Sequence, residues 1–385
     1  MAIRKKKRQV LVVTGTRADY GILQPVLRAI DKHPKLQLKV LITGMHLLSK
    51  FGRTADEVET DGWPIAGRVR LQGIRDNVFA NSRAMGYAIA HITKIFQRTG
   101  TEIVVVLGDR MEMFAAAAAA TASQRTLAHI HGGDAAVGVQ DDAYRHAISK
   151  LAHIHFTAST GATRRLVRLG EDSFRIYQTG SPALDNLRKK IRRKISLLNT
   201  WVGFDVRDDY LIILYHPAGG TAAEEAARMR QILRGCERND LKIMMLYPNC
   251  DPGHSGILRT VQSYNRQKAA PLIRHLPREI FLGLLIRARA LVGNSSCGLI
   301  EAGFLNVDVI NVGPRQNGRD RGRNVIDVDY NSQEVSQALD RIVKKRTSHR
   351  KICHIYGDGR SAGRISRLLA TICLNQALKQ KQITY

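Results

Sequence analysis

Side chains suited to acid–base chemistry follow short apolar runs in the first half of the chain. They are carboxylates, a histidine and an arginine: Asp109, His131, Asp134, Asp141 and Arg145. Carboxylates that lie close together push their pKa values apart, which suits one as a general acid and another as a general base. We therefore expect acid–base catalysis. The residues themselves leave open whether His131, Asp134 or Asp141 is the base.

Each of these residues also has an interpretation without catalysis. Asp109 taken alone fits the N-cap of the helix that follows it. Asp141 and Arg145 are spaced i, i+4, which fits a surface ion pair of little energetic value. A metal site at His131 and Asp134 is disfavoured, because the glycine-rich loop that holds them has no regular ligand pattern. We expect neither a metal nor a cofactor.

A loop suited to an anion follows the first apolar run, at residues 14–21 (TGTRADYG). Gly15 lets the backbone approach a ligand, the start of a helix supplies free N–H groups, and Arg17 supplies a fork for phosphate. The glycines of this loop fall at 15 and 21 only, so it is not the Gly-x-Gly-x-x-Gly loop of dinucleotide enzymes. The loop predicts a phosphate rather than NAD.

A second small-residue loop lies in the other half, at residues 293–298 (GNSSCG). Its N–H groups and the hydroxyls of Ser295 and Ser296 suit a diphosphate, and Glu301 is placed to accept hydrogen bonds from ribose. A tight turn explains this loop equally well when it is taken alone. Together with residues 14–21, it favours the binding of a nucleoside diphosphate.

The elements that must position these residues are strand-like runs that alternate with helical stretches, which indicates parallel sheets built from βαβ units. The expected strands are 10–13, 38–43, 103–107, 127–130, 153–157 and 176–179, then 210–215, 242–247, 272–273, 290–292 and 307–312; helices are expected at 22–32, 81–97 and 113–123. We predict an α/β protein with two Rossmann-like, doubly wound domains. The loops after the strands should then line one rim that faces the crevice between the domains.

The domain boundaries follow from the same pattern. We expect an N-terminal domain at 1–180, a basic helical linker at 181–208, a C-terminal domain at 209–360, and a final helical segment at 361–385 that packs back on the first domain.

The composition is strongly basic, with 60 Lys and Arg against 33 Asp and Glu, a net charge of +27. Much of that charge lies at 4–8, 188–194 and 344–346, outside the strand segments, and only 6% of the residues are aromatic. Bases therefore have few rings on which to stack, and we expect no specific nucleic-acid partner. The five cysteines form no C-x-x-C pair, and the first apolar run is too short for a signal core or a membrane span. We expect a cytoplasmic protein.

Six motifs occur together in a fixed order. They are 13–21 (VTGTRADYG), 108–110 (GDR), 131–134 (HGGD), 141–146 (DDAYRH), 293–296 (GNSS) and 315–319 (RQNGR). With these motifs the chain resembles the hydrolysing UDP-N-acetylglucosamine 2-epimerases of sialic and related nonulosonic acid pathways. The resemblance extends from about residue 9 to about residue 365. The Ala-Asp after Arg17 resembles the hydrolysing branch, whereas non-hydrolysing relatives typically have Pro-Glu there.

The resemblance implies a GT-B type fold, with UDP between two Rossmann-like halves, and a UDP-HexNAc substrate that loses UDP by anti elimination before water adds. By motif, Asp109, His131, Asp141 and Arg145 fall on sugar-side acid–base positions, and His216 falls near the phosphates. Positions that contact UDP fall on Arg17, Arg110, Asn249, His275, Ser295, Ser296, Glu301 and Arg315. Two positions depart from the pattern: some relatives have Glu in place of His131, and Glu is common in place of Asp134.

Three alternatives remain open at this point. The substrate is either UDP-N-acetylglucosamine or a modified sugar such as a 2,4-diacetamido-6-deoxy hexose. A glycosyltransferase of the same fold would instead need an acceptor and would release UDP without epimerisation. We also expect a homo-oligomer, a dimer or a tetramer, although no motif specifies it.

Overall fold

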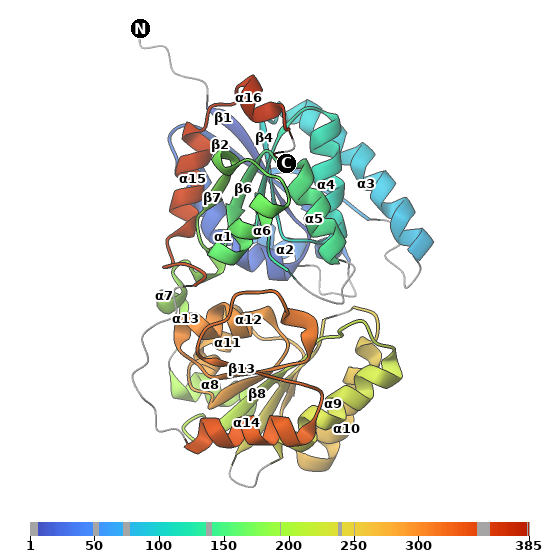
Figure 1. Ribbon diagram of the computed structural model, residues 1–385, viewed down its shortest axis with the longest axis vertical. Helices are drawn as coiled ribbons and strands as arrows, with labels where there is room; N and C mark the ends of the chain where they lie inside the picture. The colour runs from blue at the N-terminus through green and yellow to red at the C-terminus, as the bar shows by residue number, and fades with distance from the viewer. Residues whose placement is uncertain are drawn as a thin grey trace. The chain divides into compact units, whose positions relative to one another are not determined.

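The computed structural model describes residues 7–48, 54–71, 78–135, 141–192, 194–237, 241–249, 251–344, 355–382 and 384. The chain divides into two compact units (Figure 1). Unit 1 comprises Met1–Asp134, Gln140–Asp185 and Gly357–Tyr385, and unit 2 comprises Ala135–Val139 and Asn186–Tyr356. Within the described ranges, no helix is both long enough and apolar enough to cross a membrane.

Unit 1 is a parallel sheet of seven strands in the order β3-β2-β1-β4-β5-β6-β7. The strands are β1 (Arg8–Thr14), β2 (Leu36–Thr43), β3 (Ile65–Val69), β4 (Ile103–Leu107), β5 (Thr126–Ile130), β6 (Ile154–Thr157) and β7 (Ile176–Gln178). The α-helices are α1 (Arg17–Asp31), α2 (Ala55–Thr60), α3 (Val78–Thr99), α4 (Met111–Ala122), α5 (Asp141–Leu151), α6 (Thr160–Arg168), α15 (Ser361–Thr371) and α16 (Gln376–Lys379). Short 3₁₀ turns lie at η1 (Gly44–Leu47), η3 (Ser173–Arg175) and η4 (Pro182–Leu184).

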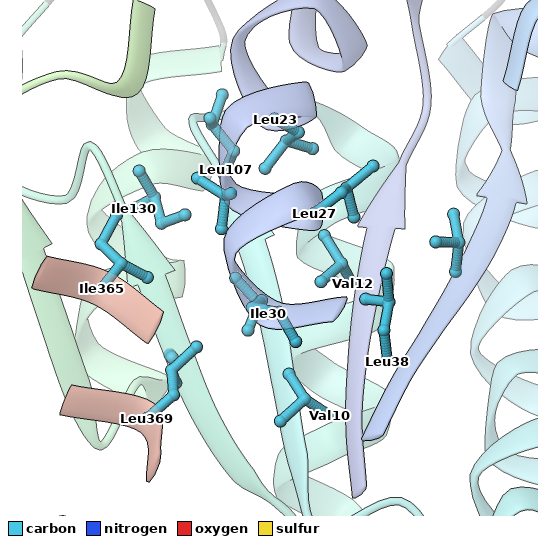
Figure 2. Close-up of a cluster of buried hydrophobic side chains, with 14 of the residues drawn as sticks. Val10, Val12, Leu23, Leu27, Ile30, Leu38, Leu107, Ile130, Ile365 and Leu369 are labelled. Carbon is cyan, nitrogen blue, oxygen red and sulfur yellow. The ribbon is translucent and has the colours of Figure 1, made fainter. Parts of the chain in front are cut away.

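The sheet of unit 1 has a buried apolar layer on each face. Successive residues of β1 point to opposite faces, so Val10 and Val12 join one cluster and Leu11 joins the other. The C-terminal helix α15 contributes Ile365 and Leu369 to the first cluster; Figure 2 shows them on the same face as the side chains of β1. The last helical segment of the chain is thus part of the core of unit 1.

Unit 2 is a second parallel sheet, of six strands, in the order β10-β9-β8-β11-β12-β13. The strands are β8 (Tyr210–Leu214), β9 (Lys242–Leu246), β10 (Leu272–Ile273), β11 (Ala290–Gly293), β12 (Val309–Val312) and β13 (Val325–Val328). The helices are α7 (Leu187–Lys190), α8 (Ile195–Val202), α9 (Ala222–Cys236), α10 (His254–Lys268), α11 (Arg278–Leu285), α12 (Ser296–Leu299), α13 (Glu301–Leu305) and α14 (Ser332–Lys344), with a 3₁₀ turn at η5 (Pro314–Gln316). One apolar cluster joins β8, β9, β11 and β12 to α9, α10 and α14.

Two strands were not expected from the sequence, β3 and β13. Both lie at an edge of their sheet, and neither is buried throughout, in contrast to the fully buried β4 and β8. An edge strand needs no continuous apolar run, so the signal used for the other strands is missing. In the segment expected as a linker, η4 belongs to unit 1, whereas α7 and α8 belong to unit 2.

Candidate functional site

The candidates of unit 1, from both the sugar-side and the UDP-contacting sets, follow three adjacent strands of its sheet. Arg17 follows β1, Asp109 and Arg110 follow β4, and His131 and Asp134 follow β5. The strand order reverses between β1 and β4: β2 and β3 follow β1 on one side, and β5, β6 and β7 follow β4 on the other. Such a switch point, at the carboxyl ends of the strands, is where open α/β sheets bind ligands.

Arg145 of α5 holds two carboxylates. Its Nη2 donates to Asp109, and its Nε lies 3.3 Å from Asp142 Oδ1. Burial alone lowers the pKa of Arg145, but attraction to Asp109, Asp134 and Asp142 outweighs burial and raises it. Arg145 is therefore a fixed, buried cation, while the side chains of Asp109 and Asp142 are each about a quarter exposed, at 24% and 25%. This cluster offers partly exposed carboxylates around one permanent positive charge.

One interpretation of these residues changes. The N-cap of α4 is Arg110, which makes no side-chain capping bond, so the reading of Asp109 as the N-cap is wrong. Asp142, three residues before Arg145, binds that arginine. Asp141 begins α5, and its side chain lies outside the described part of the chain.

His131 is held from both sides of its ring. Its Nδ1 lies 3.0 Å from Asp134 Oδ2, and its Nε2 lies 2.9 Å from Ser181 Oγ. All three side chains are buried. His131 has φ +66°, a left-handed conformation that is uncommon outside glycine, so the turn itself is constrained at this residue.

The loop after β1 satisfies its own donors. The Asp19 carboxylate accepts from the N–H of Gly15 at 3.1 Å and from the N–H of Thr16 at 2.8 Å, and the Thr16 hydroxyl caps the N–H of Asp19. The N–H groups of Gly15, Thr16 and Asp19 are therefore already bonded within the loop. Gly15 is required for another reason: a Cβ there would lie 2.4 Å from Glu112 Cγ. Arg17 lies on the surface, where its Nε is 3.2 Å from Glu57.

Three buried groups that the sequence analysis missed support the same edge of unit 1. His46 lies 3.0 Å from the Thr14 hydroxyl, and Glu112 accepts from Arg110 Nε at 2.9 Å. Burial lowers the pKa of His46 to about 4 and raises the pKa of Asp19 to about 6. Asp19 could have been found, because Thr16 and Asp19 have the spacing of a capping box. His46 and Glu112 have no local signal, because sheet order alone brings them to the loop.

The candidates of unit 2 follow five adjacent strands, from β10 to β12. In sheet order they are His275 after β10, Asn249 after β9, His216 after β8, Ser295 and Ser296 after β11, and Arg315 after β12. The switch point of this sheet lies between β8 and β11, since β9 and β10 extend to one side and β12 and β13 to the other. These five loops therefore lie at the carboxyl ends of the strands of unit 2, whereas Arg17 and Arg110, also predicted to contact UDP, belong to unit 1.

Hydrogen bonds tie the loops together at this switch point. Asn294 accepts from the His216 N–H and donates to the His216 carbonyl, both at 2.8 Å, and Arg315 Nη1 donates to the Asn294 carbonyl at 3.1 Å. The Asn249 N–H donates to His216 Nδ1 at 3.0 Å. Burial, with a smaller contribution from Arg315, lowers the pKa of His216 to about 3, so this imidazole is neutral at physiological pH.

Two buried acceptors beside this network have no partner among the described residues. They are Asn249 Oδ1 and Gln316 Oε1. Gln316 is only 1% exposed, and its amide nitrogen donates to the Asn294 carbonyl at 2.8 Å. A buried acceptor without a partner is costly. Each atom could accept from a donor that reaches it, such as the N–H of a base or the hydroxyl of a ribose.

The loop after β11 differs from the expected glycine-rich cradle. Gly293 has φ +141°, and a Cβ there would lie 2.0 Å from the Leu214 carbonyl oxygen, so its first role is the close approach of β11 to β8. The following helical segment is divided into α12 and α13 at Ile300. Glu301 is buried and accepts from Arg278 Nη2 at 3.0 Å, a partner that the sequence analysis did not foresee.

A metal centre finds no support in the described part of the chain, where no three His, Cys, Asp or Glu side chains are placed to share an ion. The side chains described above are arginines, histidines, carboxylates, amides and hydroxyls. They suit an anionic organic ligand.

Comparison with known proteins places this geometry among sugar-nucleotide enzymes. The model of the family described as UDP-N-acetylglucosamine 2-epimerase matches residues 28–370. The hydrolysing UDP-N,N'-diacetylbacillosamine 2-epimerase of Legionella pneumophila is 34% identical over 378 residues, 98% of this chain and 100% of that one. The UDP-N-acetylglucosamine 2-epimerase of Neisseria meningitidis serogroup B is 35% identical over 334 residues, 86% of each chain.

A solved structure shares the fold. The UDP-GlcNAc 2-epimerase from Neisseria meningitidis, crystallised with UDP-GlcNAc, superposes with a TM-score of 0.79 at 18% identity, over 94% of this chain and 99% of that one. The two-domain α/β architecture expected from the sequence, of GT-B type, is confirmed.

Proposed function

We propose that this chain, which belongs to the UDP-N-acetylglucosamine 2-epimerase family, is a hydrolysing enzyme that converts a UDP-HexNAc to UDP and the free 2-epimeric sugar. A base removes the proton from C2, the C1–O bond breaks with its electron pair leaving on UDP, and a glycal remains. Water then adds across the double bond, its hydroxyl to C1 and a proton to the opposite face of C2. Atoms balance as UDP-HexNAc plus water giving UDP plus a manno-configured HexNAc.

The observation that carries the acid–base half of this proposal is the Asp109–Arg145–Asp142 cluster. Proton transfer to and from carbon needs groups that reach the substrate, and these two carboxylates are partly exposed at the carboxyl ends of the strands. The buried guanidinium keeps both carboxylates oriented. We assign proton transfer at C2 to Asp109 together with the acidic pair that opens α5, Asp141 and Asp142.

The nucleotide half of the proposal rests on unit 2. Five loops meet at one edge of its sheet, Arg315 supplies a cation, and Asn249 and Gln316 bring buried acceptors to the same network. His216 is neutral there, so it is suited to hydrogen bonding rather than to charge pairing. We assign UDP to this edge, with Arg315 on the phosphates and the amide acceptors on the donors of the base or the ribose.

A second substrate is favoured by one observation. The Legionella relative that matches 98% of this chain is named for UDP-N,N'-diacetylbacillosamine, a UDP sugar with a second acetamido group. The chemistry at C1 and C2 is the same for both substrates, so the acid–base assignment does not depend on the choice. UDP-N-acetylglucosamine and UDP-N,N'-diacetylbacillosamine therefore form the two arms of the test.

The experiment is to incubate the purified chain with each UDP sugar and to follow UDP release with a coupled assay, and the free sugar by NMR. UDP release with a manno-configured free sugar supports the proposal and identifies the substrate. Recovery of the C2-epimeric UDP sugar, without net UDP release, would show a non-hydrolysing enzyme. UDP release only when a sugar acceptor is added would show a glycosyltransferase.

A further inference from the structure

The imidazole of His131 belongs to a chain of hydrogen bonds that has a direction. A carboxylate accepts, so the 3.0 Å contact with Asp134 places a proton on Nδ1. The Nε2 of the neutral ring then accepts from the Ser181 hydroxyl at 2.9 Å. Ser181 Oγ in turn accepts from the Ala183 N–H at 3.3 Å. Each of these groups thus has one consistent role as donor or acceptor.

This chain of bonds singles out one ring nitrogen. Since Nδ1 is committed to Asp134, Nε2 is the nitrogen left for proton exchange, and a proton reaches it past or through the Ser181 hydroxyl. Ser181 is only 1% exposed and His131 only 6%. Loss of the hydroxyl would leave Nε2 without its donor in a buried site, so the ring would be free to reorient.

Ser181 is itself held by the last long helix of the chain. The Asp185 carboxylate accepts from the N–H groups of Ser361 at 2.8 Å and Ala362 at 2.6 Å, the first two residues of α15. The Ser361 hydroxyl donates to the Gly180 carbonyl at 2.7 Å. The N-cap of α15, Arg360, makes no side-chain capping bond, so Asp185 supplies the cap from 176 residues away in the sequence. Residues 180–185 are therefore clamped by α15 on both sides of Ser181.

We propose that Ser181 is a positioning residue for His131, and that α15, by clamping residues 180–185, sets the orientation of this imidazole. The inference rests on the proposed function, in which His131 stands at a sugar-side acid–base position. In this proposal α15 affects catalysis through Ser181 and His131, and not through contact of its own residues with the substrate.

The test compares two serines of the same kind. Ser159 is also 1% exposed and also caps a helical turn, by accepting from the Ala162 N–H at 3.2 Å, but its hydroxyl is not the hydrogen-bond partner of His131. Ser181→Ala should lower kcat by about tenfold to a hundredfold with KM nearly unchanged, because reacting groups that lose their orientation lose rate rather than affinity. Ser159→Ala should leave kcat within about twofold.

The decisive readout is nitrogen NMR of the histidine rings, with the His131 signals identified by their loss in His131→Gln. In the wild-type chain at about pH 8, His131 should show a protonated Nδ1 and an unprotonated Nε2. Ser181→Ala should shift the Nε2 signal, and Ser159→Ala should not. Ser361→Ala keeps Ser181 but removes the hydrogen bond from the Ser361 hydroxyl to the Gly180 carbonyl, so it should shift the same signal less. This variant replaces Ser181→Ala in the test if Ser181→Ala does not fold.

The results separate this inference from the proposed function. Unchanged His131 signals in both Ser181→Ala and Ser361→Ala overturn the positioning role, as does an equal loss of kcat in Ser181→Ala and Ser159→Ala. If the wild-type chain releases no UDP from either sugar, the proposed function fails, and the NMR signals still decide whether Ser181 and α15 orient the ring.

Discussion

A buried carboxylate, that of Glu171, binds the C-terminal segment to the rest of unit 1. Replacement of Glu171 should lower the stability of the fold in a pH-dependent way. Glu171 accepts from His155 Nε2 at 2.9 Å and from Lys381 Nζ at 2.6 Å, and its side chain is fully buried. Burial opposes ionisation, but the hydrogen bonds from His155 and Lys381 outweigh it and lower the pKa of Glu171 from 4.5 to about 2. Glu171→Gln removes this carboxylate and keeps its shape.

The size of the effect follows from the pKa shift. A carboxyl group whose pKa falls from 4.5 to about 2 on folding contributes about 3 kcal/mol of folding free energy. Because the pKa is depressed in the folded state, this stability is fully present above about pH 4.5 and is lost as the pH falls towards about 2. At pH 7, Glu171→Gln should therefore lower the melting temperature of unit 1 by about 6–12 °C.

The assay is thermal unfolding followed by circular dichroism, at about pH 7 and about pH 3. The difference between wild type and Glu171→Gln should be large at the higher pH and should shrink at the lower. Asp205→Asn is the matched control: Arg207 lowers the pKa of Asp205 to about 2 as well, but this pair is exposed and screened by solvent. Equal melting temperatures at about pH 7 for wild type and Glu171→Gln would refute the reasoning, as would a difference that does not depend on pH.

Three further predictions follow from the two sheets. Asp109→Asn should bind UDP normally in calorimetry but should lose deuterium exchange at C2, because an amide still accepts from Arg145 but does not take up the proton. Exchange at the wild-type rate would refute the assignment. Arg315→Met should weaken UDP binding by at least about tenfold, whereas the control Arg341→Met, in the last turn of α14, should not. Equal UDP affinities of Arg315→Met and the wild type would remove Arg315 from the nucleotide site. Gly293→Ala should lower the free energy of unfolding by about 3 kcal/mol or more in denaturant unfolding, since its Cβ would meet the Leu214 carbonyl. A denaturation midpoint equal to that of the wild type would contradict this account of β11.

Among the described strands, the sequence predicted all except β3 and β13, together with the loops that follow the predicted strands. Parallel strands buried on both faces are apolar runs, so β4 and β8 are visible in the sequence, whereas the edge strands β3 and β13 are not. Asp109 and His131 were identified as candidates because each follows such a strand. The same rule collected the nucleotide-side candidates at one edge of unit 2.

The partners of these residues could not be predicted in the same way. Arg145 binds Asp109 from 36 residues away, and Ser181 meets His131 from 50 residues away. Such contacts depend on which strands are adjacent and on where the chain returns, and spacing along the sequence carries neither. In the loop after β1, Asp19 binds the N–H groups of Gly15 and Thr16, a local contact that the sequence analysis did not predict.

The central claim, hydrolysis through loss of the C2 proton, is tested most directly by one reaction in deuterated water. Wild-type enzyme with UDP-N-acetylglucosamine or UDP-N,N'-diacetylbacillosamine should release UDP and a manno-configured free sugar that carries deuterium at C2. A free sugar that retains its original hydrogen at C2 and its original configuration would contradict the account, because UDP would then have left by simple hydrolysis without elimination.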